Sequence, residues 1–260
     1  MTRKAPAVRG NIPTEQATAA EVLAWGIKQF GTGFGICTSF QLSGMVIIDM
    51  AKRLEVGTFQ VFTIDTGRLP EATHEIIERT RERYGIEIKV LHPDAVEIDT
   101  MVTEHGADLF YESAENRHLC CEIRKVRPLQ KELKLFDAWA VGLRRDQAGS
   151  RADVRKVEID EKNGNIYKLS PLADWSERQV DDYIRCYDVP KHQLFSEGYT
   201  SIGCAPCTRA TFDGEHIRAG RWWWEAESNK ECGIHLIDAD GAVTSKSDTN
   251  LQELSRNTKE

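Results

Sequence analysis

The sequence lacks any apolar run close to the roughly twenty residues that cross a bilayer as a helix. Its polar start, MTRKAPAVRGNIPTEQATAA, also lacks the apolar middle of a secretory signal. An excess of positive charge is missing too, because a net charge of −7 gives no overall attraction for nucleic acid or an acidic membrane. These absences predict a cytoplasmic protein without nucleic-acid or membrane partners, in which local basic groups hold any anionic ligand.

Internal repeats, low-complexity stretches and a Walker A phosphate loop are also absent. The chain has 260 residues of ordinary globular composition, with 40% hydrophobic and 29% charged residues. A chain of this length forms one sizeable core, or a core with a small appendage. The sequence leaves open whether the protein is a homo-oligomer.

Short β-rich runs alternate along the chain with segments of helical periodicity. Strands are predicted at FGICTSF (34–40), TFQVFTIDTG (58–67), IEIKVL (86–91), AWAVGL (138–143) and IYKLSPL (166–172). Helices are predicted at residues 43–54, 70–85 and 176–189. The alternation indicates an α/β fold with an open, mainly parallel sheet that is covered on both faces.

Three loops follow predicted strands, and the carboxyl ends of parallel strands form the usual ligand site of such a sheet. The loops are CTSFQLSG (37–44), IDTG (64–67) and GLRRDQAGSR (142–151), so we expect them to be neighbours. The stretch SFQLSG also precedes a helix, whose first backbone N–H groups favour an anion.

Seven cysteines are present, and four of them form two close pairs, Cys120–Cys121 and Cys204–Cys207. In a reducing cytosol such thiols are metal ligands or redox groups more often than disulfides. Adjacent cysteines make a strained disulfide and converge poorly on one zinc ion, whereas a [4Fe–4S] cluster offers each thiolate its own iron. We favour the cluster, with zinc and unliganded thiols as the alternatives.

Cys232 stands apart from both pairs, in the stretch NKECGIHL. One interpretation is a small buried apolar residue. The other is a nucleophilic thiolate, which Lys230 would favour and Glu231 would oppose. The neighbouring residues do not decide between them.

Nine basic residues form three groups beside these motifs. They are Arg124, Lys125 and Arg127; Arg144, Arg145 and Arg151; and Arg209, Arg218 and Arg221. Arginines near strand ends of an acidic protein indicate a bound phosphate or sulfate, although a solvated surface explains any single one. The run RWWWEAE then supplies three indoles that cannot all face one side of a helix. We expect two of them to fill local core, and the third is a candidate to shield a site.

Taken in order, CCEIRKVRPL, IDTG, GLRRDQ, GYTSIGCAPCTRA, RAGRWWWE and ECGIHL resemble the sulfonucleotide (APS/PAPS) reductases. The resemblance covers about residues 20–236 and is greatest to the iron–sulfur branch, the assimilatory adenylyl-sulfate (APS) reductases. It implies an adenine-nucleotide α-hydrolase-like domain over residues 20–203. A flexible N-terminus (1–19), an irregular Cys/Trp-rich segment (204–236) with the catalytic cysteine and a polar tail (237–260) would complete the chain.

The resemblance also implies a role for individual residues. The [4Fe–4S] ligands would be Cys120, Cys121, Cys204 and Cys207. Substrate contacts would come from Ser39, Thr66, Gly67, Lys125, Gly142, Arg151, Arg218 and Arg221. Cys232 would be the nucleophile.

The implied function is reduction of adenosine 5′-phosphosulfate (APS) to sulfite and AMP in sulfate assimilation, through an S-sulfocysteine on the enzyme. Electrons would come from thioredoxin or a similar dithiol protein. The nearest alternative is a reductase of 3′-phosphoadenylyl sulfate, or of both substrates. A more distant one is a zinc-stabilised interaction module without enzymatic activity.

Overall fold

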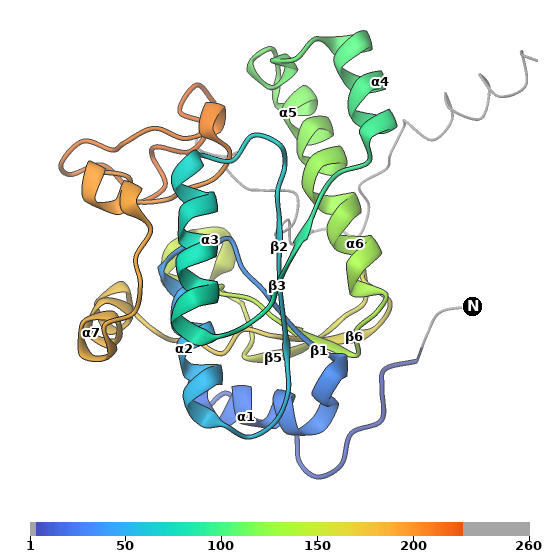
Figure 1. The fold of residues 1–260 in the computed structure, drawn as a ribbon, viewed down its shortest axis with the longest axis vertical. Coiled ribbons are helices and arrows are strands. Elements are labelled where there is room, and N and C mark those ends of the chain that lie inside the picture. Colours follow the sequence, from blue (N-terminus) through green and yellow to red (C-terminus); the bar gives the residue numbers. More distant parts are fainter. Residues whose placement is uncertain (1–3, 226–260) are drawn as a thin grey trace, which may run out of the picture.

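We describe residues 4–225 of the chain from a computed structural model, in which a twisted sheet lies between helices (Figure 1). The strands are β1 (Phe34–Cys37), β2 (Gln60–Ile64), β3 (Ile88–Leu91), β4 (Ala138–Ala140), β5 (Val157–Asp160) and β6 (Ile166–Leu169). Their order in the sheet is β3-β2-β1-β4-β6-β5, and only β5 runs antiparallel to its neighbour. The open, mainly parallel α/β fold predicted from the sequence is confirmed.

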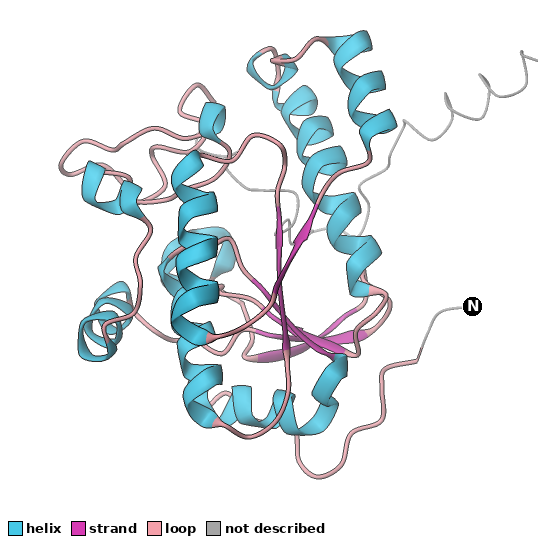
Figure 2. Cartoon of the chain, in the orientation of Figure 1, coloured by secondary structure: helices cyan, strands magenta, loops and turns pink. Residues whose placement is uncertain are grey.

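Seven α-helices are found between residues 4 and 225, and Figure 2 shows them around the magenta strands. They are α1 (Ala19–Phe30), α2 (Leu42–Leu54), α3 (Glu71–Tyr84), α4 (Ala95–His105), α5 (Ala114–Cys121), α6 (Arg127–Leu133) and α7 (Glu177–Tyr187). None of the helices in this part of the chain is long and apolar enough to cross a membrane.

Alternate residues of the strands face two separate cores. Ile36 and Val61 pack with α1, α2, α3 and α7 on one face, whereas Phe62 and Trp139 pack with α6 on the other. This period of two is what a strand imposes when both faces of its sheet are covered. The sheet therefore leaves only its strand ends open to a ligand.

The three predicted helices begin and end close to their expected positions. Ser176 caps α7 through a reciprocal pair of bonds with Gln179, and Gly85 ends α3 in the left-handed conformation (φ 57°). Pro70, expected within the first turn of α3, lies one residue before it as the N-cap. The five predicted strands are also present, although each is shorter than its apolar run.

The sequence interpretation missed four helices, α1, α4, α5 and α6, together with the edge strand β5. β5 and β6 form a hairpin whose turn contains Asn163 and Gly164, a recognisable turn signal. From residue 188 to 225 the chain has only short 3₁₀ turns, as the loss of periodicity near Ser196 indicated. The division at residues 203 and 204 into two units stays a prediction.

Candidate functional site

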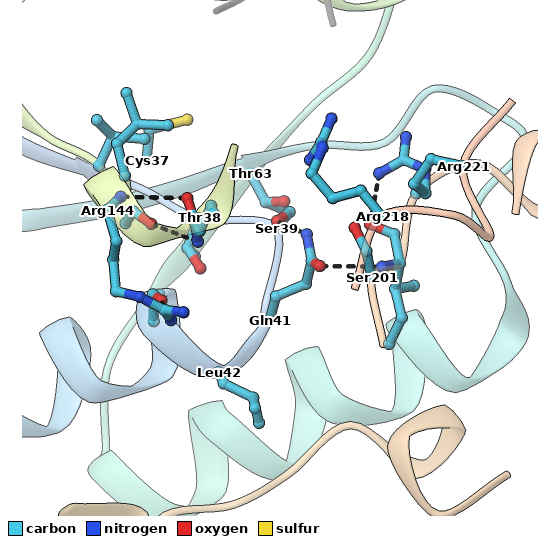
Figure 3. A pocket seen from close by; sticks show the side chains of 18 of the residues that line it. Cys37, Thr38, Ser39, Gln41, Leu42, Thr63, Arg144, Ser201, Arg218 and Arg221 are labelled. Carbon is cyan, nitrogen blue, oxygen red and sulfur yellow. Dashed lines mark hydrogen bonds between the residues drawn. The ribbon is translucent and has the colours of Figure 1, made fainter. Parts of the chain in front are cut away.

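The carboxyl ends of β1, β2 and β4 open onto one cleft, which we call the strand-end cleft. Loops from all three predicted segments line it, together with residues 200–203, Ile217, Arg218 and Arg221. Figure 3 shows Arg144 on one side of the β1–α2 loop and Arg218 and Arg221 on the other. The expected neighbourhood of the three loops is confirmed.

The loop between β1 and α2 is held in a strained conformation. Phe40 is fully buried with φ 57°, and its N–H donates to Thr38 Oγ1 at 3.0 Å. Gln41 precedes α2 without capping it; its Oε1 accepts a bond from the N–H of Ile202 at 2.9 Å. The first turn of α2 lines the cleft, where the positive end of the helix dipole favours negative charge.

Two glycines allow this loop to pack closely against its neighbours. A Cβ on Gly44 would lie 2.2 Å from Thr38 Oγ1, and one on Gly142 would lie 2.9 Å from Ser43 Cβ. Contacts below 3.0 Å require something to move, so no other residue fits here without rearrangement. Gly142 thus brings the loop after β4 directly onto the first turn of α2.

Basic side chains dominate the charged lining of the cleft. Its lining includes five cations, Lys125, Arg144, Arg151, Arg218 and Arg221, and one carboxylate, that of Glu177. In a chain of net charge −7, this concentration produces a local positive field suited to an anion. The cleft has the charge expected of a phosphate or sulfate site.

Arg144 and Arg151 are organised by one glutamine. Gln147 Oε1 accepts bonds from Arg151 Nη1 at 2.5 Å and from the N–H of Arg144 at 3.1 Å. Arg144 Nη1 also donates to Ser43 Oγ at 2.8 Å. In the loop GLRRDQAGSR, Gln147 therefore holds the guanidinium of Arg151, whereas the guanidinium of Arg144 forms an ion pair with Asp146 (Nε to Oδ1, 2.9 Å).

Arg221 is buried at the other side of the cleft, 5% exposed. Its Nε has no hydrogen-bond partner among the described residues, and its Nη1 lies 3.4 Å from Ile202 O. A Cβ on Gly203 would lie 2.3 Å from Arg221 Nη2, so the guanidinium occupies the space that this glycine leaves. A buried donor of this kind is costly unless a ligand satisfies it.

The four paired cysteines surround a second, small cavity, which we call the cysteine cavity. All four are buried and form no disulfide within the described residues, and their neighbours in its wall include Arg68, Lys125 and Trp222. The two cysteine pairs, about eighty residues apart in the sequence, therefore lie together.

The loop after β2 joins the two cavities. Thr66 Oγ1 lies 3.2 Å from Cys204 Sγ, and Thr66 O accepts a bond from Arg124 Nη1 at 2.6 Å. Arg68 O accepts a bond from the N–H of Ala205 at 2.8 Å. The motif IDTG thus binds the C-x-x-C turn and the segment after Cys121.

A π-helical turn follows directly after the two adjacent cysteines, which lie in the last turn of α5. α5 ends at Cys121, the π turn covers Glu122–Val126, and α6 begins at Arg127. In a regular helix neighbouring side chains diverge by about 100°, and a π turn changes that spacing locally. Such turns occur frequently at functional sites.

The cysteine cavity does not fit a single metal ion. Between residues 4 and 225, no group of three or more His, Cys, Asp or Glu side chains is arranged to hold one. Tetrahedral zinc needs all of its ligands about 2.0–2.3 Å from one point, whereas a [4Fe–4S] cluster takes each thiolate on a different iron. Four buried thiols around one cavity therefore fit the cluster better than zinc.

Burial and the nearby cations have opposite effects on the pKa of these thiols. Burial raises the pKa of Cys207 to about 12 and also raises the pKa of Cys120. The cation of Lys125 lowers both, and the guanidinium of Arg124 lowers that of Cys120. Because metal ligands must be thiolates, these cations favour the ligating form.

Lys125 lines both cavities, so the strand-end cleft and the cysteine cavity share a wall at this side chain. Of the residues named from the sequence as substrate contacts, Ser39, Thr66, Gly142, Arg151, Arg218 and Arg221 also line the cleft, and their contact with a substrate stays a prediction. Gly67 is not among the lining residues; a Cβ there would lie 3.5 Å from Arg124 Nη1. Cys232 lies outside the described residues.

Some of the basic residues named from the sequence lie away from the cleft, in ion pairs with carboxylates. Arg145 pairs with Glu15, Arg127 with Glu97 and Arg209 with Glu215, and none of the three lines the cleft. Sequence reasoning did not name four further residues that line the cleft, Gln41, Ser43, Gly44 and Gln147. All four belong to motifs that the sequence analysis quotes, so the sequence already contained the information that points to them.

The three consecutive tryptophans occupy different environments. Trp222 is fully buried against the cysteine cavity, Trp224 packs partly buried beside Phe110, and Trp223 is 39% exposed. Two of them fill local core, as expected. Trp222 also lines the cysteine cavity, and the shielding of a site by one of the three indoles stays a prediction.

Comparison with known proteins identifies a matching family and several similar reductases. A family model described as the phosphoadenosine phosphosulfate reductase domain matches residues 35–210. An adenosine 5′-phosphosulfate reductase of Burkholderia cepacia is 49% identical over 72% of this chain and 73% of its own. One from Allochromatium vinosum is 43% identical over 86% of each chain.

Solved structures show the same fold. A phosphoadenylyl-sulfate reductase from Candida auris, in a phosphate complex, covers 75% of this chain and 91% of its own at 29% identity and a TM-score of 0.62. An FMN adenylyltransferase of Candida glabrata covers 94% and 86%, with 13% identity and a TM-score of 0.50, a likeness of fold alone. The sheet is thus adenine-nucleotide α-hydrolase-like, and the chain belongs to the phosphoadenosine phosphosulfate reductase family.

Proposed function

We propose that this protein is an adenosine 5′-phosphosulfate reductase, an enzyme of sulfate assimilation that releases sulfite and AMP. The observation that carries the proposal is the shared wall at Lys125, which joins a cationic cleft to a cavity lined by four cysteines. Relatives that are 41–49% identical to this chain bear the same name.

The cleft supplies the groups that an anionic sulfonucleotide needs. Arg151, Arg218 and Arg221 would hold its phosphate and sulfate oxygens through charge-assisted bonds. Ser39, Thr66 and Gly67 would contact the nucleotide, and Gly142 would keep the cleft open at the start of α2. Guanidinium groups held in advance lose little entropy when the ligand binds.

The four cysteines of the cysteine cavity would hold a [4Fe–4S] cluster. When bound, that cluster would supply electrostatic and structural support, while the thiol groups of the reaction carry the electrons. Lys125 would direct its ammonium group toward the sulfate oxygens on the cleft side. Fixed charge at that point lowers the barrier as negative charge moves toward the leaving phosphate.

Cys232 would attack the sulfur of the substrate as a thiolate. A sulfur–sulfur bond forms, the bond from sulfur to the phosphate oxygen breaks, and AMP leaves with its electron pair. A thiolate of thioredoxin, or of a similar dithiol protein, then attacks Cys232 Sγ and releases sulfite. The second thiol of the donor resolves the mixed disulfide, which returns Cys232 to its reduced form.

An anaerobic assay of sulfite release tests the substrate. We expect the protein to reduce APS with thioredoxin and to reduce the 3′-phosphorylated form much more slowly. The solved relative at 29% identity acts on the phosphorylated substrate by name, so that reaction is the second candidate. Equal or faster turnover of the phosphorylated form would establish it instead.

Metal analysis tests the cofactor. Protein purified without oxygen should be brown and contain about four iron and four acid-labile sulfide per chain. Cys204→Ser should lose both, whereas Cys186→Ser, which replaces an exposed free thiol, should retain them. Stoichiometric zinc without sulfide would identify the interaction module instead.

A further inference from the structure

Gln147 lines the strand-end cleft but has no part in the reaction as proposed so far. Its Oε1 accepts two hydrogen bonds, from Arg151 Nη1 at 2.5 Å and from the N–H of Arg144 at 3.1 Å. An amide oxygen has two lone pairs, so these two donors use its full capacity. Gln147 therefore connects a backbone donor, whose position is fixed, with a guanidinium group of the cleft.

The local fold places Gln147 at this junction. Residues Arg145–Gln147 form a 3₁₀ turn in which Arg144 is the N-cap and Gln147 is the third residue. A glutamine at that position reaches back to the N–H of the cap, as in a capping box. A second 3₁₀ turn, Gly149–Arg151, follows and ends at Arg151, which is 5% exposed. The acceptor and the guanidinium are thus brought together within one short loop.

Backbone hydrogen bonds hold both turns without the Gln147 side chain. The N–H of Arg145 donates to Ala173 O, and the N–H of Arg151 donates to Ala148 O, each at 2.9 Å. Loss of the Gln147 amide would therefore leave the path of the loop in place. It would remove an acceptor from the guanidinium of Arg151, so the expected change is in the direction of that group.

The acceptor that Gln147 offers is neutral. Arg144, at the start of the same loop, forms an ion pair with the carboxylate of Asp146. A carboxylate at position 147 would also attract the guanidinium of Arg151, but it would add negative charge to a cleft that has to bind an anion. An amide fixes the direction of the guanidinium and leaves the positive charge of the cleft unchanged.

We propose that Gln147 is a positioning residue, whose neutral amide directs the guanidinium of Arg151 toward an anionic group of the nucleotide; this inference rests on the proposed function. A guanidinium that already has its binding orientation loses less rotational freedom when the ligand arrives. Gln147 therefore acts on the ligand through Arg151.

A double-mutant cycle on AMP affinity tests this role. The variants are Gln147→Leu, Arg151→Ala and the two together, and calorimetry measures AMP binding to each holoprotein. Gln147→Leu should weaken binding about tenfold, the lower end of the effect of a hydrogen bond to a charged group. Combined with Arg151→Ala, it should add less than about twofold. Additive losses, or no loss in the single variant, would overturn the proposal.

Gln147→Glu tests the neutrality of the acceptor. It retains an oxygen that Arg151 can bind, but it adds one negative charge to the cleft. AMP binding should weaken by about tenfold or more at low ionic strength, and the difference from the parent should shrink at high salt, because salt screens the repulsion. AMP affinity equal to the parent's would show that an uncharged acceptor is not required.

Gln60→Leu is the matched control. Gln60 begins β2, its Nε2 donates to Thr32 O at 2.6 Å, and it lines neither cavity. This variant should bind AMP as the parent does. Thermal unfolding and iron content identify variants that are misfolded. If Gln147→Leu is among them, Gln147→Asn takes its place in the cycle, because an amide that is shorter by one methylene should lose the same contact.

The cycle also separates this inference from the proposed function. A parent protein that binds AMP but releases no sulfite from APS would refute the function, whereas the coupling between Gln147 and Arg151 would still be measured. Sulfite release with additive losses in the cycle would refute the positioning role alone. A parent protein that does not bind AMP would refute both.

Discussion

Replacement of Cys232 with serine is expected to abolish both the covalent intermediate and turnover. With APS alone, the parent protein should release AMP and gain the mass of one SO₃ group on the NKECGIHL peptide. The variant should form no adduct, and its rate should fall by roughly 10⁴-fold or more, as when other enzymes lose a nucleophile. Intact-protein and peptide mass spectrometry measure the adduct, and a sulfite assay measures the rate.

Two other cysteines serve as controls for this result. Cys37 lies at the end of β1, where burial raises its pKa to about 12, so it is a thiol at neutral pH. Cys186 is exposed on α7. Serine at either position should leave the adduct and the iron content unchanged. An adduct that maps to one of them would show that the nucleophile has been misassigned.

Lys125→Ala is expected to slow turnover severely while the protein stays folded and retains its iron. Lys125 lines both the cleft and the cysteine cavity, so its positive charge lies near the place where an anionic sulfur centre would react. Loss of one charged contact costs about 1.5–3 kcal/mol, which corresponds to a fall of about 10- to 150-fold in kcat/KM. Steady-state kinetics, iron analysis and thermal unfolding measure the three quantities.

Lys131→Ala is the matched control, because Lys131 is exposed on α6 and lines neither cavity. It should retain full activity. A Lys125→Ala protein with normal kcat/KM and normal iron would show that the shared wall plays no part in the reaction. Iron loss in that variant would instead assign Lys125 to the cysteine site alone.

The sequence predicted the strand-end cleft well because its components follow strong local rules. Buried strands such as FGIC and QVFTI end in Gly, Ser and Thr loops, and parallel strands bring those loops to one edge. The cysteine spacing likewise predicted a common site. What sequence could not show is how the loop packs: the buried Phe40 with positive φ depends on tertiary contacts that no local propensity encodes.

Two of the missed helices, α4 and α5, have weak local signals, whereas α1 was missed although Thr18 and Glu21 form a capping box. α4 contains β-branched residues at Val96, Ile98 and Val102, and α5 has only eight residues. Arg117 illustrates the same limit for charge, because nothing in AENRHLCC marks this arginine as fully buried. Its burial follows from a partner 108 residues away, which only the folded chain brings near.

Because of the π turn between them, α5 and α6 present their side chains in directions that one continuous α-helix would not allow. A continuous α-helix advances about 100° per residue, so its cysteines and its core leucines would share one fixed angular relation. The turn over Glu122–Val126 breaks that relation: α5 directs Cys120 and Cys121 toward their cavity, while α6 directs Leu129 and Leu133 into the core beneath the sheet. Deletion of a single residue here would turn α5 and α6 into one continuous helix. The cysteines and the leucines could then no longer both face their present surroundings, so either the thiol site or the core would be disrupted.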